Sequence, residues 1–323
     1  PISENKTYIK NDQNILIINY DFKNFYKNIL IYLFYFLKNF IRSFFFRNLE
    51  MIDFNNTNFS KDLSNILVKL VKEKNIRNFL FPYEAQPHQH FITKELKRNN
   101  NKLKIIGYMH TVIPPVPLDY IKREGHPDLL LVNGIDQKNI LCKKLGWKEK
   151  EVRNIVSLRY NIIDKINFKG NIFLPYFIED ENKMFYFFKK LINLKKNLFF
   201  PKLKVKNHPS MEGSYKHKNL KNKIEKYLIQ NKKLFKNRHS NRNLSLFFGS
   251  TASVIECLER GSRAFHICSD PDLEKFDNYF WKRLNILKLD KNIFEYRLKG
   301  KDKIIKINKK INKNFQFKKL LTN

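Results

Sequence analysis

One group of polar side chains in the carboxyl-terminal half has the types and spacing of a phosphate site. Gly249 follows an apolar run and precedes Ser250, Thr251, Ala252 and Ser253. A glycine permits a tight turn, and the Ser250 and Thr251 hydroxyls can cap a helix whose free N–H groups attract an anion. Glu256, one turn further on, could then reach the hydroxyls of a sugar. The segment predicts phosphate binding, with simple helix capping as the alternative.

A histidine in the same half could join this site. In the loop Asn207-His208-Pro209-Ser210, Pro209 ends a predicted strand and leaves His208 at the carboxyl end of that strand. A histidine there can donate a hydrogen bond to a phosphate oxygen, although it could also be a loop residue without a role. Because both loops follow strands of one half, we expect them to converge on a nucleotide site.

The amino-terminal half carries a second group. Glu84 and His88 come after one predicted strand, His110 after the next, and Asn133 and Gly134 after a third. The ends of successive parallel strands share one edge of a sheet, where ligands bind. A carboxylate and an imidazole at that edge could deprotonate a hydroxyl. His88 and His90 are two residues apart, but no third metal ligand of suitable spacing lies near them, so no metal is predicted.

Strands alternating with helices must position these groups. The pattern predicts an α/β fold with a parallel sheet covered on both faces, and it restarts after Tyr160–Lys169. We therefore expect two α/β lobes, at residues 1–165 and 166–298, followed by a basic tail at 299–323. The strands are expected at 14–19, 78–82, 103–109, 128–132, 151–156, 171–177, 203–206, 244–248 and 263–267, and the helices at 29–46, 60–74, 85–98, 134–145, 179–194, 215–230 and 251–260.

The charge of the chain indicates an anionic partner. The 323 residues include 63 Lys and Arg against 30 Asp and Glu, a formal net charge of +33. Nucleic acid, phospholipid head groups or a phosphorylated substrate would each satisfy this charge. No zinc-finger spacing or RNA-recognition signature accompanies it, so no specific nucleic acid is expected. The three cysteines share no metal-ligand spacing and fit a reducing compartment.

The longest apolar stretch, Ile29–Phe46, predicts a helix that lies in a membrane interface. Only its first nine residues are free of charged or amide side chains, which is too short to span a bilayer. Lys27, Lys38 and Arg42 fall near one face at helical spacing, opposite a broad aromatic face. The alternative is a domain helix packed on a sheet.

Several segments, taken in order, resemble a known family. PYEAQPHQ, KIIGYMHTVIPP, HPDLLLVNG, VKNHPS and GSTASVIECLERG are similar to bacterial surface-carbohydrate proteins of O-antigen and capsule biosynthesis. The carboxyl half also resembles CMP-sugar-using sialyl- and Kdo-transferases. The resemblance covers roughly residues 78–268 and implies a GT-B glycosyltransferase architecture of two Rossmann-like lobes.

The resemblance also implies roles for the residues above. His208, Pro209 and the loop Gly249–Ser253 would surround the donor phosphate, and Glu256 would hold the donor ribose. Glu84 and His110 would be catalytic on the acceptor side, with His88, Asn133 and Gly134 beside them.

The implied activity is transfer of a sugar from a nucleotide sugar to a lipid-linked surface glycan, with no metal and no other cofactor. The protein would be peripheral at the cytoplasmic face of the plasma membrane, on an anionic lipid surface. The alternatives are a non-catalytic homologue that binds glycan or nucleotide, and a basic nucleic-acid-binding α/β protein.

Overall fold

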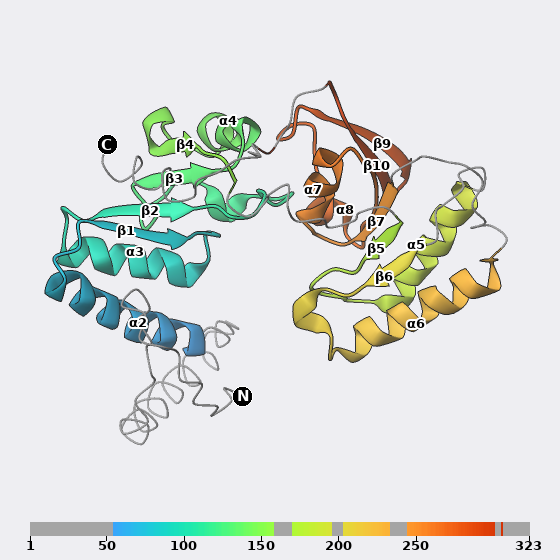
Figure 1. Cartoon of the computed structure of the whole chain (residues 1–323), viewed down its shortest axis with the longest axis horizontal. Coiled ribbons are helices and arrows are strands. Elements are labelled where there is room, and N and C mark those ends of the chain that lie inside the picture. Colours follow the sequence, from blue (N-terminus) through green and yellow to red (C-terminus); the bar gives the residue numbers. More distant parts are fainter. Residues whose placement is uncertain (1–53, 158–169, 196–202, 233–243, 301–304, 306–323) are drawn as a thin grey trace, which may run out of the picture. The chain divides into compact units, whose positions relative to one another are not determined.

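The computed structural model describes residues 54–157, 170–195, 203–232, 244–300 and 305, which form two β-sheets with flanking helices (Figure 1). The predicted strand 14–19, the helix 29–46, the linker 160–169 and nearly all of the basic tail lie outside these residues. Ser60–Asn323 group as one compact unit, separate from Pro1–Phe59. The division at residue 165 stays a prediction.

The first sheet has four parallel strands in the order β1-β2-β3-β4. These strands are β1 (Asn78–Pro82), β2 (Lys104–Tyr108), β3 (Leu129–Val132) and β4 (Val152–Asn154). Its helices are α2 (Phe54–Glu73), α3 (Pro87–Asn99) and α4 (Ile135–Lys144), with single turns η3 (Leu118–Tyr120) and η4 (Glu149–Glu151). The predicted order of strands and helices is confirmed here, with boundaries that differ by a few residues.

The three helices pack on one face of this sheet. Ile105 packs with α2 and α3, and Leu130 packs with α4. Ile105 and Gly107 point to one face because side chains alternate along a strand, and Gly107 is paired with Leu130. Leu129 and Leu131 therefore point to the opposite face, where they are buried in a separate cluster. Among the described residues, no helix provides the cover that was expected there.

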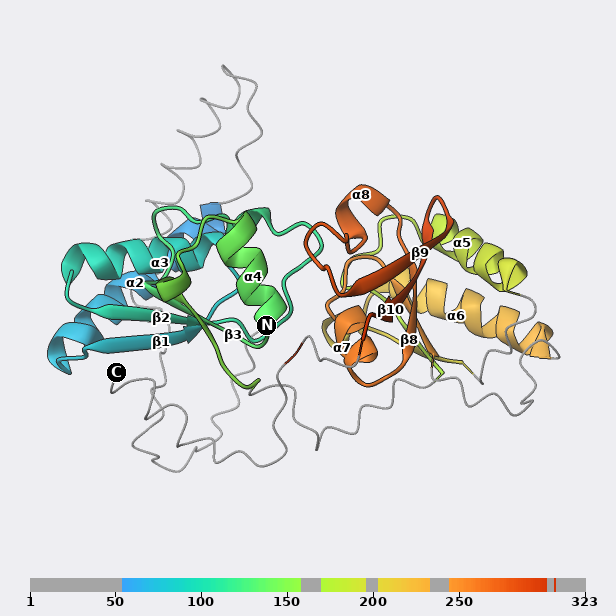
Figure 2. The ribbon, with the colours of Figure 1, turned by 90° about the horizontal axis from the view of Figure 1, so that it is seen from above.

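The second sheet has six strands in the order β6-β5-β7-β8-β10-β9. They are β5 (Asn171–Phe173), β6 (Lys204–Lys206), β7 (Leu244–Phe248), β8 (Arg263–Ile267), β9 (Leu284–Asp290) and β10 (Ile293–Leu298). Its helices are α5 (Glu181–Leu194), α6 (Tyr215–Gln230), α7 (Ser253–Glu259) and α8 (Pro271–Glu274), with one further turn, η5 (Pro209–Met211). Both views show α5 and α6 side by side along one face (Figures 1 and 2).

Each face of the second sheet contributes to a hydrophobic core. Ile172, Leu246 and Phe265 occupy one register row and pack with the buried side of α5 and α6. Phe247 and Ala264 alternate with them and pack with α7 on the other face. Because successive side chains of β7 enter these two cores in turn, all five of its residues are buried.

The prediction of purely parallel sheets is wrong for the second sheet. β10 runs antiparallel to both β8 and β9, so the sheet is mixed. In β9 only Leu284 is buried, and Lys288, Asn285 and Asp290 interrupt its apolar residues, which weakens the sequence signal of a strand. Only Lys291 and Asn292 join the two strands, as in a tight hairpin.

A buried carboxylate fastens β10 to β8. Glu295 is 1% exposed and accepts hydrogen bonds from Nε of Arg263 at 3.0 Å and Nε of Arg297 at 2.7 Å. Burial alone would raise the pKa of Glu295, but the hydrogen bonds from the two arginines hold it below its usual value. The carboxylate therefore stays charged and paired inside the sheet.

We expect Glu295→Ala to lower the free energy of unfolding by about 3–5 kcal/mol, because it leaves the partly buried Arg263 guanidinium without its partner. Urea denaturation would measure the change. The control is Glu225→Ala, which removes an exposed pair with Lys221 and should cost about 0.5 kcal/mol or less. Equal losses for the two variants would contradict a structural role for the Glu295 network.

Candidate functional site

The turn after β1 holds Glu84 in a fixed place. The side-chain oxygen of Gln89, a buried residue at the start of α3, accepts from the backbone N–H of Glu84 at 2.9 Å and of Gln86 at 3.1 Å. The Gln89 amide nitrogen donates to the Pro82 carbonyl at 2.8 Å. Ala85 has φ +59°, a left-handed conformation that costs a non-glycine residue about 1–2 kcal/mol. The hydrogen bonds of Gln89 hold this strained turn together.

The structure brings the two predicted catalytic residues together. Nε2 of His110, which follows β2, lies 3.2 Å from Oε1 of Glu84. Adjacent parallel strands place the two side chains at one edge, as expected from the sequence. Backbone hydrogen bonding from Met109 to Leu131 extends the sheet up to His110. A carboxylate and an imidazole in this contact form a pair that can hold and move a proton.

The two members of the pair are similarly exposed. The Glu84 side chain is 39% exposed and the His110 side chain is 32% exposed. Nδ1 of His110 is covered, and among the described residues no partner lies within hydrogen-bond distance of it. A ligand therefore has access to both side chains, with Nε2 as the imidazole nitrogen that faces the carboxylate. The contact alone does not distinguish the proton acceptor from its positioning partner.

The other predicted acceptor-side residues have different positions. Asn133 is fully buried and donates from Nδ2 to the Met109 carbonyl at 2.8 Å, so it braces the strand end that carries His110. Gly134 precedes the first turn of α4, and His88 lies in the first turn of α3. In the described part of the chain, His88 makes no hydrogen bond or ion pair with Glu84 or His110. Sequence reasoning missed Gln137, a buried amide that accepts from the Ile113 backbone at 3.3 Å.

Buried imidazoles fix the chain on either side of Glu84. Nδ1 of His126 lies 2.6 Å from the Tyr83 hydroxyl, and its Nε2 donates to the Ile121 carbonyl at 2.8 Å. The ring of His90 lies edge-on to His126 at 4.5 Å, with Nε2 3.0 Å from the Ala85 carbonyl. Burial, together with the neighbouring His90, lowers the pKa of His126 to about 3. The neutral ring thus accepts from the Tyr83 hydroxyl.

A close backbone approach shapes the edge of the second sheet. Gly249 ends β7 with φ +63°, and a Cβ there would lie 3.0 Å from Cβ of Pro175 in the loop after β5. Nε2 of the fully buried His266 donates to the Gly249 carbonyl at 2.6 Å. Burial lowers the pKa of His266 to about 4, so its ring is neutral at pH 7. The predicted tight turn at Gly249 is confirmed, and glycine is required by both conformation and space.

The loop after Gly249 differs in part from the expectation. Ser250 is exposed, and the Thr251 hydroxyl accepts from the Ser253 backbone at 3.3 Å. The N-cap position of the helix is Ala252, which has no side-chain cap, so the expected capping by the Ser250 and Thr251 hydroxyls is wrong. The helix spans Ser253–Glu259 rather than 251–260. Glu256 is 8% exposed and pairs with Arg260 at 3.0 Å. Its predicted contact with a ribose would require this ion pair to open.

His208 lies where the sequence placed it, after β6. Its Nδ1 accepts from the Ser210 backbone at 3.3 Å, where Pro209 begins η5, so a neutral ring carries its proton on Nε2 and can donate to an anion. The ring of Tyr176 lies edge-on to it at 5.3 Å. Strand β5 separates β6 from β7, so the His208 and Gly249 loops emerge about 10 Å apart at one edge.

Two aromatic residues between these loops were missed by sequence reasoning. The prediction extended the strand to Phe177, whereas β5 ends at Phe173. Tyr176 and Phe177 therefore lie in a loop at the carboxyl edge and are 58% and 71% exposed. The proline at 175 was the signal, because proline interrupts a strand in the middle of a sheet. Exposed aromatic rings at such an edge can stack on a nucleobase.

The remaining polar clusters do not point to a metal. Among the described residues, no three histidine, cysteine or acidic side chains gather closely enough to hold an ion. Asp270 caps α8 by accepting from the Asp272 backbone at 3.0 Å, so this Asp-x-Asp sequence forms a capping turn. No helix in the described part of the chain is long and apolar enough to cross a membrane.

Comparisons with protein-family models, with curated proteins and with solved structures found no match to this chain. The fold itself shows an α/β protein with one parallel and one mixed sheet, each flanked by helices.

The buried neutral imidazoles predict acid-sensitive stability. An unfolded histidine has a pKa near 6.5, whereas burial lowers the pKa of His126 to about 3 and that of His266 to about 4 in the folded chain. The two neutral rings contribute to the free energy of unfolding above pH 6.5. This contribution is lost as the pH falls toward 4, because the unfolded chain then binds more protons than the folded chain. Between pH 7.5 and 5.5 each should cost about 1 kcal/mol of unfolding free energy.

Urea denaturation at the two pH values measures this change, and His266→Asn, which cannot titrate, should remove about half of it. A free energy of unfolding that does not change between pH 7.5 and 5.5 would contradict the assignment of these rings as buried and neutral.

Proposed function

We propose that this chain is a metal-independent glycosyltransferase that uses a nucleotide-sugar donor. The observation that carries the proposal is the contact between the Glu84 carboxylate and His110 at the carboxyl edge of a parallel sheet, with the carboxylate half-exposed. Such edges are where α/β proteins bind ligands. The resemblance to surface-carbohydrate proteins supports the same reaction class.

In the proposed reaction Glu84 takes the proton of an acceptor hydroxyl. The acceptor oxygen forms a bond to the anomeric carbon of the donor, and the bond from that carbon to the donor phosphate breaks. The nucleotide leaves with its phosphate negatively charged. His110, whose Nε2 lies 3.2 Å from the Glu84 carboxylate, would keep that carboxylate oriented toward the acceptor.

On the donor side, the proposal places the nucleotide at the edge of the second sheet. Nε2 of His208 would donate to the departing phosphate, and Ser250 offers an exposed hydroxyl at the same edge of the sheet. Tyr176 would stack on the base. The short helix α7 contributes little, so the proposal rests on these side chains and not on a helix dipole.

The finer features implied by the resemblance belong to the same proposal. They are a GT-B arrangement of two lobes, a lipid-linked surface glycan as acceptor, and a peripheral position at the cytoplasmic face of the plasma membrane. The charge of +33 supports an anionic surface nearby.

A non-catalytic nucleotide-binding protein is a second candidate. The observation that favours it is the closed ion pair between Glu256 and Arg260, which occupies a carboxylate that the transferase hypothesis assigned to the donor ribose.

We expect Glu84→Gln to lower the rate of sugar transfer by about 10²–10⁴-fold, because the amide cannot accept the hydroxyl proton. Nucleotide affinity should be unchanged, since the donor loops are untouched. Release of nucleotide from a nucleotide sugar in the presence of a chelator, measured with a lipid-linked glycan fraction, reports the rate.

The matched control is Glu124→Gln, which changes an exposed glutamate paired with Lys94. If Glu84→Gln transfers at the wild-type rate, Glu84 is not the base. If neither Glu84→Gln nor His110→Ala changes the rate, the pair has no catalytic role.

We expect His208→Ala, Ser250→Ala and Tyr176→Ala each to weaken nucleotide binding while the melting temperature stays near that of the wild type. Loss of a charge-assisted hydrogen bond costs about 1.5–3 kcal/mol, and loss of base stacking about 1–3 kcal/mol. Calorimetric titration would measure the affinities. Tyr215→Ala, at an exposed tyrosine on α6, is the control. Wild-type affinity in all three variants would rule out this donor site.

A further inference from the structure

Helices α5 and α6 carry a concentrated positive charge. Together their sequences contain eight lysines, two glutamates and no arginine, a formal net charge of +6 over two neighbouring helices. Few acids within the pair compensate this charge: Lys221 approaches Glu225 at 3.9 Å and Lys223 approaches Glu181 at 3.7 Å. A surface of this charge attracts anions over about a Debye length.

The two helices form one continuous surface. The ring of Tyr227 packs edge-on against Phe185 and Phe188 at about 6 Å, and Nζ of Lys223 donates to Oδ1 of Asn182 at 2.6 Å. Because α5 and α6 cover the same face of the second sheet, their outward sides face solvent together (Figures 1 and 2).

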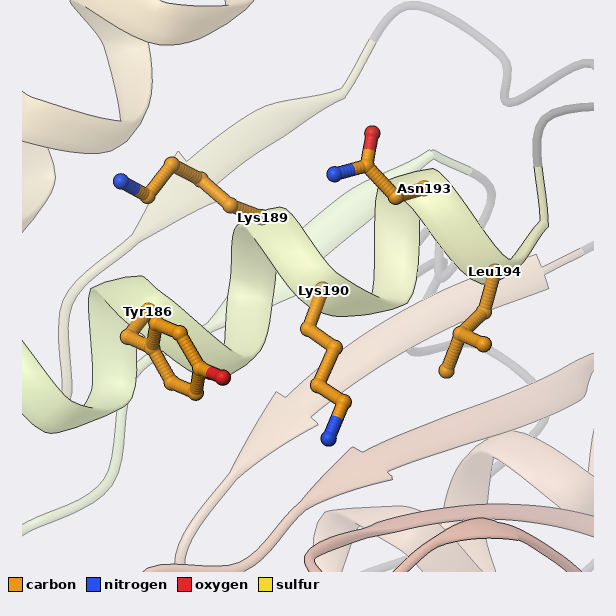
Figure 3. A pocket seen from close by; sticks show the side chains of 5 residues that line it. All are labelled: Tyr186, Lys189, Lys190, Asn193 and Leu194. Atoms are coloured by element: carbon orange, nitrogen blue, oxygen red, sulfur yellow. The ribbon is translucent and has the colours of Figure 1, made fainter.

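Exposed apolar side chains accompany the lysines of the two helices. Leu194 and Tyr186 on α5 are 48% and 56% exposed, and Ile229 on α6 is 73% exposed. Tyr186 and Leu194 line a shallow hollow of about 460 Å³ together with Lys189, Lys190 and Asn193 (Figure 3). Lys190 and Leu194 are turned toward the neighbouring strands, where Nζ of Lys190 pairs with Asp290 of β9 at 2.7 Å, so the hollow extends from the outward side of α5 to its flank beside β9. Lysine heads beside aliphatic and aromatic side chains are typical of a membrane-interface surface.

We propose that the outward side of α5 and α6 docks on a bilayer containing anionic phospholipid. Lysines suit diffuse attraction to head groups, whereas phosphate and base recognition in nucleic acids favours the planar fork of arginine. Exposed Leu194 and Ile229 gain from entering the acyl boundary and gain nothing from a nucleic acid backbone. The docking rests on the proposed position at a membrane but not on the transfer reaction, and it uses a surface other than the Ile29–Phe46 segment.

The test is co-sedimentation of the full chain with vesicles at about 0.1 M salt. One set is phosphatidylcholine alone, and the other contains about one third phosphatidylglycerol. The first variant changes four lysines of the pair to glutamine: Lys183, Lys189, Lys218 and Lys226. Its charge-matched control changes four exposed lysines elsewhere: Lys72, Lys102, Lys143 and Lys150. The second variant is Leu194→Asn with Ile229→Asn.

We expect the wild type to prefer the anionic vesicles, and the first variant to bind them at least about 100-fold more weakly, since each lysine near the surface is worth about fivefold. The charge-matched control should lose much less affinity for the anionic vesicles. The second variant should bind them more weakly than the wild type at all salt concentrations. Equal losses in the first variant and its control would overturn the proposal.

The proposal would also be overturned if a random duplex competes the chain off vesicles through the same lysines while Leu194→Asn with Ile229→Asn has no effect, which would indicate nucleic-acid binding. Nucleotide binding by the same preparations is measured in parallel, so failure of the docking surface is distinguished from failure of the proposed transferase.

Discussion

The position of Glu84 depends on a single buried amide. Gln89 accepts from two backbone N–H groups and donates to one carbonyl, and so closes the turn between β1 and α3. These bonds, with the contact of His90 Nε2 to the Ala85 carbonyl at 3.0 Å, compensate the strain of the left-handed Ala85. His110 reaches Glu84 only because this turn returns the chain to the end of β2, so the carboxylate and imidazole pair is a consequence of the amide.

The edge of the second sheet is built on a comparable constraint. Gly249 lies so close to Pro175 that a larger residue would displace one of the two loops, and His266 holds the Gly249 carbonyl from below. In both sheets a buried, neutral polar side chain fixes the backbone, and the residues presented at the edge are partly or fully exposed. This division leaves Glu84, His208 and Ser250 available to a ligand without loss of packing.

The sequence could predict much of this arrangement, and the failures have physical reasons. Strands such as Leu244–Phe248 and Arg263–Ile267 are fully or nearly buried, so hydrophobicity alone located them to the residue. The hairpin of β9 and β10 was missed because β9 is only partly buried and because a glutamate, Glu295, lies among the buried residues of β10.

Among site residues, Glu84 and His110 were predictable as ends of adjacent strands, and their contact is confirmed. His126 and His266 were not, because their roles depend on partners far away in the chain. Gln89 was missed although its partners are only three to seven residues away, because its role depends on the conformation of the turn. Tyr176 was hidden by a strand predicted four residues too long.

The measurement that tests the central claim most directly is a thermal-shift screen of the full chain against nucleotides and nucleotide sugars, in the presence of a chelator. The account predicts that one nucleotide class stabilises the chain, by about 2.7 kcal/mol when the ligand is at 100 times its dissociation constant. The matching nucleotide sugar should stabilise it as well. If no nucleotide and no nucleotide sugar shifts the melting temperature at millimolar concentration, the chain is not a nucleotide-sugar-dependent transferase.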